Sequence, residues 1–193
     1  AGTGNSGFLD STTGILAKFY KPYGIISDGT NLYVTDDKNH KVRKIVISTG
    51  AVSTFAGSTS GFLNGTGTAA KFKNPKGITT DGTNLYVADR TNNKIRKIVI
   101  SSRVVTTLAG SGTQGSDDGT DTSASFNKPM GITIDGTNLY VAERYNNKIR
   151  KIVIATGVVT TIAGSGSSGS ADGTGTAATF NNPQGITSDG TDI

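Results

Sequence analysis

The sequence repeats itself with a period of 53 to 54 residues. A phrase that reads Gly-Ile, two variable residues and Asp-Gly-Thr begins at Gly24, Gly77, Gly131 and Gly185. All 4 prolines stand two residues before one of these glycines. A regular period of this length predicts a chain of similar supersecondary units, each of which packs on the next.

Each complete copy contains four short apolar runs, which in the second copy span residues 77–80, 84–89, 94–100 and 104–110. They are rich in Ile, Val, Leu, Thr and Tyr and are separated by turn residues such as Asp81-Gly82, so we expect strands. Runs such as Lys-Ile-Val-Ile are apolar on both side-chain faces, which indicates a sheet covered on both sides.

The longest connection in each repeat joins the fourth strand to the first strand of the next copy. It is rich in Gly, Ser and Thr, and we expect the phenylalanine at its end to fill the gap between adjacent sheets: Phe19, Phe72, Phe126 and Phe180. Four antiparallel strands per repeat and such connections predict an all-β fold, a β-propeller with four-stranded blades. A parallel β-helix is the alternative, but its rungs are much shorter than this period.

The repeat positions divide the chain into three full blades and two partial ones within one propeller domain. Residues 1–23 would end a preceding blade and supply its connection, residues 24–76, 77–130 and 131–184 would form the full blades, and residues 185–193 would begin a further one. Since about four blades is the smallest closed form, the propeller needs completion. We expect further blades of a longer chain to supply it; a second copy of the chain is the alternative.

Composition excludes several kinds of chemistry. With no cysteine, the chain has no disulfide, thiolate nucleophile or cysteine-held metal. His40 is the only histidine, so one chain cannot build a metal site from several imidazoles, and we expect its ring to bond the backbone of a loop. No apolar stretch could cross a bilayer, residues 1–7 lack the features of a signal peptide, and the net charge of +5 does not by itself indicate nucleic acid.

The pattern G-x-G-x-x-G, typical of dinucleotide-binding loops, begins at Gly2, Gly110 and Gly164. In a nucleotide site such a loop opens a helix whose N-terminus holds the pyrophosphate. Here it leads into sequence rich in Gly, Ser and Asp, and it recurs from repeat to repeat. The pattern therefore indicates a structural turn, and no cofactor is expected.

Acidic residues are the remaining candidates for metal binding or catalysis, because no G-x-S-x-G nucleophile motif occurs. Asp117, Asp118 and Asp121 could gather around Ca²⁺, although they do not fit the spacing of a calcium-binding loop, and carboxylates that cap turns are the alternative. A second acidic set recurs at the end of each second strand, where we expect it to accept backbone N–H bonds in the following turn: Asp36, Asp89 and Glu143.

A basic set recurs on each third strand and raises the question of RNA binding. We expect these long side chains to cover the flank of a sheet and to keep their charged ends in solvent. RNA binding would also need exposed aromatic rings, for which Tyr20, Tyr23 and Tyr145 are candidates. The basic residues are Lys41, Arg43, Lys44, Lys94, Arg96, Lys97, Lys148, Arg150 and Lys151.

Residues 84–100 (NLYVADRTNNKIRKIVI) resemble an NHL repeat. That family has an apolar strand, an acidic residue and then Asn-His-(Arg/Lys)-Ile; residues 39–42 match it well, whereas Asn93 and Asn147 replace the histidine in later copies and Glu143 replaces the aspartate. The resemblance covers essentially the whole chain and implies a propeller that is secreted or displayed on the cell surface of a bacterium. Related propellers include lyases, lactone-cleaving enzymes and RNA-binding proteins, so the resemblance does not choose a function.

Strand alternation places the loops of each repeat on two faces. The turns between first and second strands read Asp-Gly-Thr-(Asn/Asp) in every copy and share one face. The loops after the second and fourth strands share the opposite face, which we call the variable face because its residues differ between copies. Variation on a uniform scaffold is typical of recognition surfaces. The candidate binding residues are Tyr23, Asp37, Lys38, Lys73, Lys76, Arg90, Thr91, Lys128, Met130, Arg144, Tyr145 and Gln184.

The sequence thus favours a non-catalytic binding or scaffolding propeller that contacts protein partners or a surface through the variable face. An enzyme of the lactonase or lyase type is one alternative, and it would need a central divalent metal completed by blades outside this sequence. An RNA-binding propeller with a basic face is the other.

Overall fold

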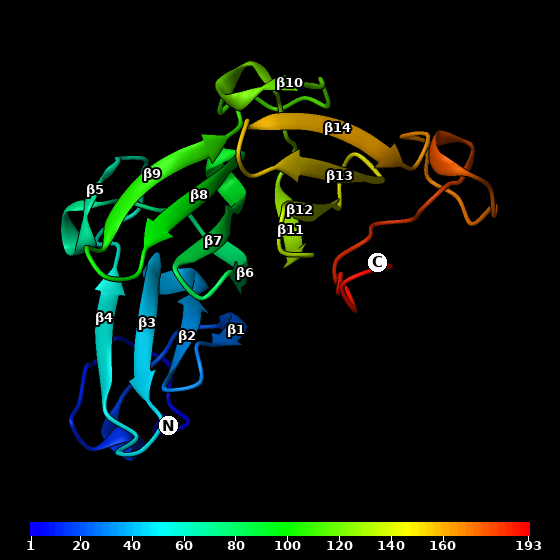
Figure 1. The fold of residues 1–193 in the computed structure, drawn as a ribbon. Coiled ribbons are helices and arrows are strands. Elements are labelled where there is room, and N and C mark those ends of the chain that lie inside the picture. Colours follow the sequence, from blue (N-terminus) through cyan, green and yellow to red (C-terminus); the bar gives the residue numbers. More distant parts are fainter. The chain divides into compact units, whose positions relative to one another are not determined.

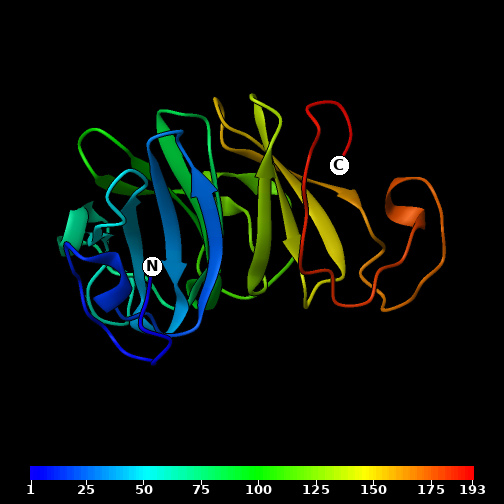
Figure 2. The same ribbon diagram turned by 90° about the horizontal axis from the view of Figure 1, so that it is seen from below.

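The computed structural model describes residues 1–193, which form fourteen β-strands and six 3-10 turns of three residues (Figure 1). The strands make three sheets, in each of which four long strands follow one another in sequence order. In Figure 2 the strands of each sheet lie side by side and are joined by short turns. These sheets are β-propeller blades, as the sequence predicts. No helix is both long and apolar enough to cross a membrane.

The first sheet contains the strands of the first copy in the order β1-β2-β3-β4. All its neighbouring strands pair in antiparallel fashion. The strand bounds are β1 (Pro22–Ser27), β2 (Asn31–Asp36), β3 (Lys41–Val46) and β4 (Val52–Ala56).

The second and third sheets repeat this pattern and each add a short fifth strand at one edge, in the orders β5-β9-β8-β7-β6 and β10-β14-β13-β12-β11. The second sheet has β5 (Gly65–Thr66), β6 (Pro75–Thr80), β7 (Asn84–Asp89), β8 (Lys94–Val99) and β9 (Val104–Ala109). The third has β10 (Gly119–Thr120), β11 (Pro129–Ile134), β12 (Asn138–Glu143), β13 (Lys148–Val153) and β14 (Val158–Ala163).

The two edge strands come from the long connections and are not anticipated by the sequence pattern. In β5, Gly65 lies opposite Val105 and Thr66 opposite Val104; β10 pairs in the same way with β14. Each connection therefore first completes the outer edge of the sheet that it leads into. A Gly-Thr pair carries no apolar alternation, so nothing in the sequence distinguishes it from its loop.

Short 3-10 turns lie in two recurring places. One set lies in the loops after the second strands: η2 (Asp37–Asn39) and η4 (Arg90–Asn92). The other set lies in the segments that precede each first strand: η1 (Gly14–Leu16), η3 (Gly67–Ala69), η5 (Asp121–Ser123) and η6 (Gly175–Ala177).

Two compact units make up the chain, Ala1–Val87 with Lys97–Thr106 and Ala88–Arg96 with Thr107–Ile193. In the first unit, Tyr33 and Phe55 of the first sheet meet edge-to-face, with ring centroids 4.9 Å apart. They share one buried cluster with Leu85 and Val87 of β7 and with Phe72. Adjacent blades thus pack through apolar faces, and the phenylalanine that ends the connection fills the space between them, as expected.

The second unit has a core of the same kind. Phe126 is fully buried, as are Leu139, Val141 and Ile152 of the third sheet. The guanidinium of Arg150 lies 5.3 Å from the centre of the Phe126 ring. The phenylalanine therefore contacts a buried charge as well as the apolar core.

The glycine after each fourth strand is required by its backbone geometry. Gly110 and Gly164 have φ angles of 104° and 94°. A Cβ added to them would lie 2.5 Å from the carbonyl oxygen of Asn93 and 2.3 Å from that of Asn147. The start of the G-x-G-x-x-G pattern is thus a tight structural turn, which agrees with its recurrence between repeats.

The turn between the first two strands of each copy forms a closed hydrogen-bond cluster. In the second copy, Asp81 accepts from the N–H groups of Thr83 (2.8 Å) and Asn84 (2.6 Å), from the Asn84 side chain (2.9 Å) and from the Tyr86 hydroxyl (2.8 Å). The Asp-Gly-Thr-Asn sequence therefore satisfies its own polar groups, as a hairpin signal predicts.

Residues 185–193 repeat the start of a copy but form no strand. The turn is kept, because Asp189 accepts from the N–H groups of Thr191 and Asp192 at 2.8 Å each. In the third copy, the equivalent strand is held by β12, which follows its turn in the sequence. The turn is thus a local property, whereas the strand depends on its partner.

Candidate ligand-binding face

One arginine on each third strand is fully buried: Arg43, Arg96 and Arg150. Each donates to the buried acid that ends the preceding strand, with distances of 2.8 Å to Asp36, 2.8 Å to Asp89 and 2.7 Å to Glu143. The expectation that the basic residues of the third strands hold their charges in solvent is therefore wrong for the arginines. A buried carboxylate seven residues earlier draws the guanidinium inward, which sequence spacing does not reveal.

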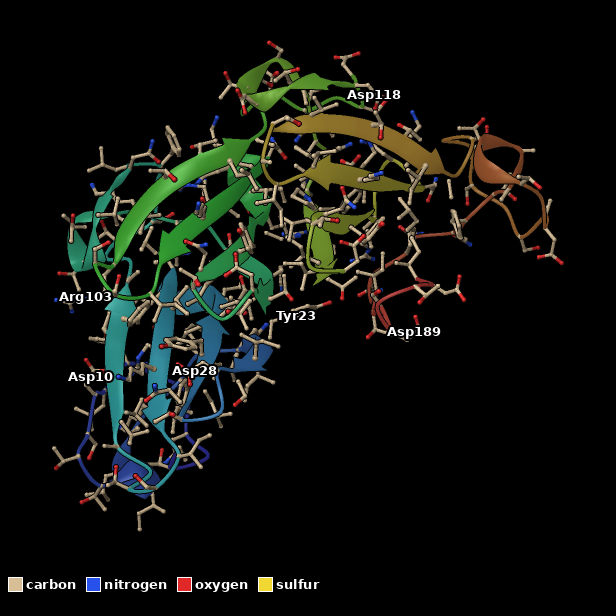
Figure 3. All side chains as sticks on the ribbon, in the orientation of Figure 1. Asp10, Tyr23, Asp28, Arg103, Asp118 and Asp189 are labelled. Atoms are coloured by element: carbon tan, nitrogen blue, oxygen red, sulfur yellow. The ribbon has the colours of Figure 1, made fainter.

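The remaining guanidinium hydrogen bonds fasten the long connection to its blade. Arg150 donates to the carbonyl oxygens of Ser125 (3.0 Å) and Asp117 (2.8 Å) and to Asp118 (2.8 Å). Arg43 makes the matching set, with the Lys18 and Leu9 carbonyls and the side chain of Asp10. Asp10 and Asp118 thus belong to equivalent parts of the chain (Figure 3).

The acids that pair with the arginines also hold backbone N–H groups, but not those of the expected turn. Asp36 accepts from the N–H of Tyr20 at 2.7 Å, and Glu143 from that of Asn127 at 2.8 Å. Both donors belong to the incoming connection. The turn itself is held by an asparagine side chain, since Asn146 donates to Glu143 at 3.0 Å. The expectation of backbone bonds within the turn is therefore corrected.

Two lysines of the third strands also use their ammonium groups in hydrogen bonds within the protein. Lys94 is buried and donates from Nζ to the carbonyl oxygen of Gly110 at 2.8 Å. Lys148 donates to the hydroxyl of Ser116 at 3.2 Å. Lys44, Lys97 and Lys151 are half-buried.

His40 links one blade to the connection of the next, which confirms that its ring bonds the backbone. It has a left-handed backbone, with φ 57°, and Nδ1 accepts from the N–H of Asn74 at 3.1 Å. Burial lowers the pKa of His40; Asp37 opposes this shift, and nearby lysines add to it. The ring is therefore held in its neutral form, which the accepting Nδ1 requires.

Asparagine performs the same task in the later copies. The side-chain oxygen of Asn93 accepts from the N–H of Lys128 at 2.9 Å, and that of Asn147 from the N–H of Asn182 at 3.0 Å. Both asparagines have left-handed backbones, with φ of 53° and 50°. The replacement of histidine by asparagine thus keeps both the backbone conformation and the hydrogen bond.

The three aspartates considered for calcium do not converge on one point. Asp117 accepts from the hydroxyl of Ser125 at 3.0 Å, whereas Asp118 pairs with Arg150. Asp121 lies in a left-handed turn. No group of three or more His, Asp and Glu side chains is arranged to hold a metal ion. These three aspartates therefore do not form one calcium site.

On the variable face of the first unit, charges are neutralised within the protein. Asp37 pairs with Lys76 at 2.9 Å, and the ammonium of Lys76 lies 4.3 Å from the centre of the Tyr23 ring. Tyr23 is exposed (Figure 3), whereas Asp37 is only 3% exposed. Asp37 was expected as a surface contact; its pairing with Lys76 draws it inward instead.

On the variable face of the second unit, three cations surround one exposed tyrosine. Lys128 lies 4.8 Å, Arg144 5.4 Å and Arg90 6.0 Å from the centre of the Tyr145 ring. Tyr145 is 45% exposed. None of the three cations forms an ion pair. We call these four residues the cation cluster.

The other expected binding residues divide into exposed and covered positions. Met130 is 3% exposed, so its expected role on the surface is wrong, because the start of β11 turns this side chain into the fold. Lys38, Lys73 and Gln184 are exposed, and Thr91 is half-buried. The structure thus brings together Tyr23, Asp37 and Lys76 in one unit and the cation cluster in the other.

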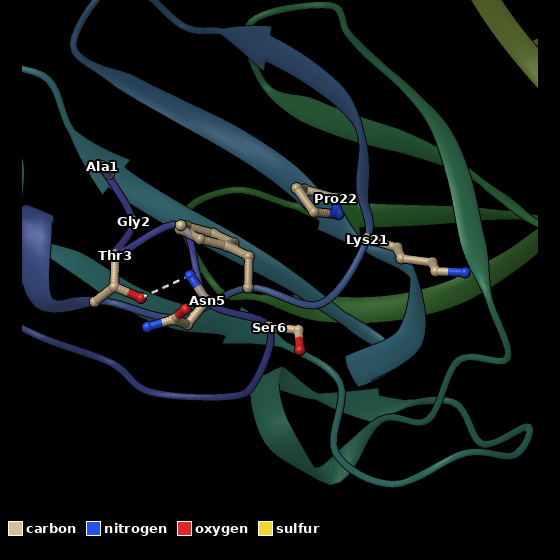
Figure 4. Close-up of a pocket in the computed structure, with 9 residues that line it drawn as sticks. Ala1, Gly2, Thr3, Asn5, Ser6, Lys21 and Pro22 are labelled. Atoms are coloured by element: carbon tan, nitrogen blue, oxygen red, sulfur yellow. Dashed lines mark hydrogen bonds between the residues drawn. The ribbon is translucent and has the colours of Figure 1, made fainter.

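A cavity of about 300 Å³ lies at the N-terminal segment, and Figure 4 shows its lining. It is walled by residues 1–6 together with Phe19, Lys21 and Pro22. Within this wall the Thr3 hydroxyl accepts from the N–H of Asn5 at 3.2 Å. Lys21 is its one side chain with a charge, so the cavity has no acid–base pair for catalysis.

Comparison with known proteins finds NHL-repeat proteins among the sequence relatives of this chain. No family model matches the chain. It is 32% identical over 176 residues to NHL repeat-containing protein 2 of Bos taurus, covering 82% of this chain and 24% of that protein, and 31% identical to the Homo sapiens protein. The chain belongs to the NHL-repeat family. It spans about a quarter of the length of these curated relatives.

Solved structures show the same fold as these NHL repeats. A protein of unknown function from Bacteroides thetaiotaomicron superposes with a TM-score of 0.71 at 26% identity, covering 88% of this chain and 42% of that one. An auxiliary nutrient binding protein from the same organism superposes with a TM-score of 0.69 at 20% identity, covering 90% of this chain and 44% of that one. The second likeness shows the fold alone.

The NHL motif accounts for the buried residues but not for the cation cluster. The motif joins blades to connections through its acidic residue and its Asn-His or Asn-Asn pair. The arginine that follows the motif has the same role. Sequence reasoning missed the role of Asp10 and Asp118; their one signal is that they stand 33 and 32 residues before the arginine that they bind. The cluster lies at positions that the motif leaves free.

Proposed function

We propose that this NHL propeller is a non-catalytic binding or scaffolding protein that contacts protein partners or a surface through its variable face. The cation cluster carries this proposal. Three cations surround one exposed tyrosine ring, and none of them pairs with an acidic side chain of the protein. Their charges are therefore available to a partner. On the opposite face, the Asp-Gly-Thr-Asn turns satisfy their own hydrogen bonds.

The recurring acids support a non-catalytic role. Asp36, Asp89 and Glu143 are fully buried and hold arginines, so they have no access to a substrate. His40, the only imidazole, is engaged as a hydrogen-bond acceptor. A general acid or base must reach the reacting group, and none of these residues can.

The proposed completion of the propeller rests on the exposed face of the first sheet. Ile25 is 58% exposed, whereas Ile78, at the same position in the next copy, is 6% exposed. Ile25 lines an apolar hollow of about 360 Å³ with Leu32, Val34 and Ile45. Because the matching face of the second copy is covered by the first sheet, we propose that a further blade covers this one.

Secretion or display on a cell surface is proposed with this function. This proposal rests on the resemblance to repeat-rich NHL proteins of bacterial surfaces, and a chain without cysteine is compatible with either redox environment.

Enrichment of partners from the organism's surface proteins tests the variable face. The immobilised chain is compared with a variable-face variant, Tyr23→Ala/Lys38→Glu/Tyr145→Ala, and with an opposite-face control, Thr30→Lys/Thr83→Lys. We expect the same proteins to be retained by the wild type and the control and lost with the first variant. Equal retention by both variants would overturn the proposal, provided that circular dichroism shows that both are folded.

A further inference from the structure

We propose that the cation cluster is a binding site for a ligand group that carries two or more negative charges on oxygen, such as a phosphate or adjacent carboxylates. This inference deepens the proposed function, on which it rests, by naming the chemistry that the variable face recognises. Its residues are Arg90, Lys128, Arg144 and Tyr145.

The first argument is the arrangement of the cations. All three lie within 6.0 Å of the centre of one ring, so they approach the same small region from different elements. Arg90 begins η4, Lys128 immediately precedes β11, and Arg144 follows β12. Attraction to the ring face holds each cation in place before any ligand arrives.

The second argument is the absence of a counter-charge. Like charges repel one another, and the buried arginines and Lys76 each have a carboxylate within 4 Å. The cluster has none. The Nε atoms of Arg90 and Arg144 are buried and have no hydrogen-bond partner, a feature that they share with Nε of Arg150 on β13, so it does not by itself distinguish the cluster. An oxyanion would relieve the repulsion and accept from the remaining guanidinium N–H groups, for which Arg geometry is suited.

The third argument comes from the first copy of the repeat. Asp37 stands at the position of Arg90 and Arg144, directly after the acid that pairs with the buried arginine. There its carboxylate lies 2.9 Å from the ammonium of Lys76, beside the Tyr23 ring. In the first copy the ammonium of Lys76 therefore contacts both a carboxylate and a tyrosine ring. In the second unit arginines stand at the position of that anion, and no carboxylate of the protein pairs with them.

The test is a titration of the protein with inorganic phosphate and, separately, with a triglutamate peptide. The arginine Nε–H resonances are followed by nuclear magnetic resonance, and the affinity is measured by calorimetry. We expect saturable shifts of the Arg90 and Arg144 signals and competition between the two probes. Saturation by phosphate alone would assign the site to phosphate or sulfate groups, and saturation by the peptide alone to paired carboxylates; either supports an oxyanion site.

Three variants make the test specific. Arg90→Gln/Arg144→Gln should weaken binding by about a hundredfold or more, since each of the two lost charged hydrogen bonds contributes about 1.5 to 3 kcal/mol. The matched control, Lys44→Gln/Lys151→Gln, removes the same charge from the third strands and should bind as the wild type does. Arg90→Asp builds an anion into the cluster, as in the first copy, and should weaken binding more than Arg90→Gln does.

Linear, non-saturating shifts, or unchanged affinity in Arg90→Gln/Arg144→Gln, would overturn the oxyanion site. That outcome is distinct from failure of the proposed function. If the variable-face variant still loses its partners while the cluster binds no anion, the face recognises other chemistry. If the cluster binds anions but partner retention is the same in all variants, the scaffolding role fails instead.

Discussion

At the scale of single residues, the fully buried arginines decide how each blade holds its connection. Arg150 neutralises Glu143 and donates to two carbonyl oxygens of the connection, so one side chain satisfies groups from three segments. A charge in such a place stabilises the fold only while all its partners are present, because the low-dielectric interior penalises any charge left alone.

Replacement of Arg150 by Met should therefore destabilise the protein strongly. The change leaves the Glu143 carboxylate buried without its partner, and we expect the free energy of unfolding to fall by about 3 to 5 kcal/mol. Urea denaturation followed by circular dichroism measures this. The double variant Arg150→Met/Glu143→Leu should recover much of the loss. If the double variant were no more stable than the single one, the ion pair would not be the cause.

His40 should make the first unit sensitive to mild acid. Its pKa is lowered in the folded protein, so the folded state prefers the neutral ring, and the stability that this supplies is complete above about pH 6.5. It is lost as the pH falls through the lower pKa of the folded state, when Nδ1 becomes protonated and can no longer accept from Asn74. The loss should be about 1 kcal/mol.

The matched variant is His40→Asn, which copies Asn93 and Asn147. It should match the wild type near neutral pH and lack the loss of stability in mild acid. Thermal unfolding measured across this pH range decides the matter. Identical profiles for the two proteins would show that the His40–Asn74 bond does not control the acid response.

At the scale of elements, the aspartate of the Asp-Gly-Thr-Asn turn stabilises the hairpin by accepting hydrogen bonds from the residues that follow it. Partial burial opposes ionisation of Asp28, but hydrogen bonds from Asn31, Thr30 and Tyr33 prevail and lower its pKa to about 2. Burial and the bond to Asp28 raise the pKa of Tyr33 to about 12. The turn therefore couples an ionised acid to a neutral tyrosine.

Both shifts predict how stability depends on pH. The contribution of Asp28 is present above about pH 4 and lost as the pH falls towards 2, whereas that of Tyr33 is present below about pH 10 and lost as the pH rises towards 12. Asp28→Asn should lower the pKa of Tyr33, because it removes the anion that holds the phenol neutral. Ultraviolet absorbance titration of tyrosinate, compared between the variant and the wild type, measures this. An unchanged titration curve would contradict the coupling.

At the scale of the whole molecule, the first sheet has an exposed apolar face around Ile25. A polypeptide of these 193 residues should self-associate through this face when no further blade is supplied. Native mass spectrometry and sedimentation should show oligomers that Ile25→Glu reduces. Ile47→Glu, at an isoleucine that is 50% exposed elsewhere, is the control and should not reduce them. A monomer at all concentrations would contradict the prediction.

The sequence by itself determined the features that depend on neighbouring residues. The period, the apolar runs, the Asp-Gly turns and the phenylalanine before each proline were enough to predict propeller blades and the strand positions. A strand or a hairpin is specified within a few residues, so a single repeat carries all the information. The variable face followed from alternation of the loops alone.

Tertiary structure decided which charged side chains are buried and which of them form ion pairs. Arg96 and Lys97 are adjacent in a basic run, yet one is fully buried against Asp89 and the other is half-buried; Asp37 and Arg90 hold the same position, yet one is paired and the other is not. Whether a charge is buried depends on partners that lie seven residues away for Arg96 and 39 residues away for Asp37, and on the low dielectric between packed sheets. The sequence named Arg90, Lys128, Arg144 and Tyr145 as candidate binding residues, but only the folded chain shows that the three cations surround one ring.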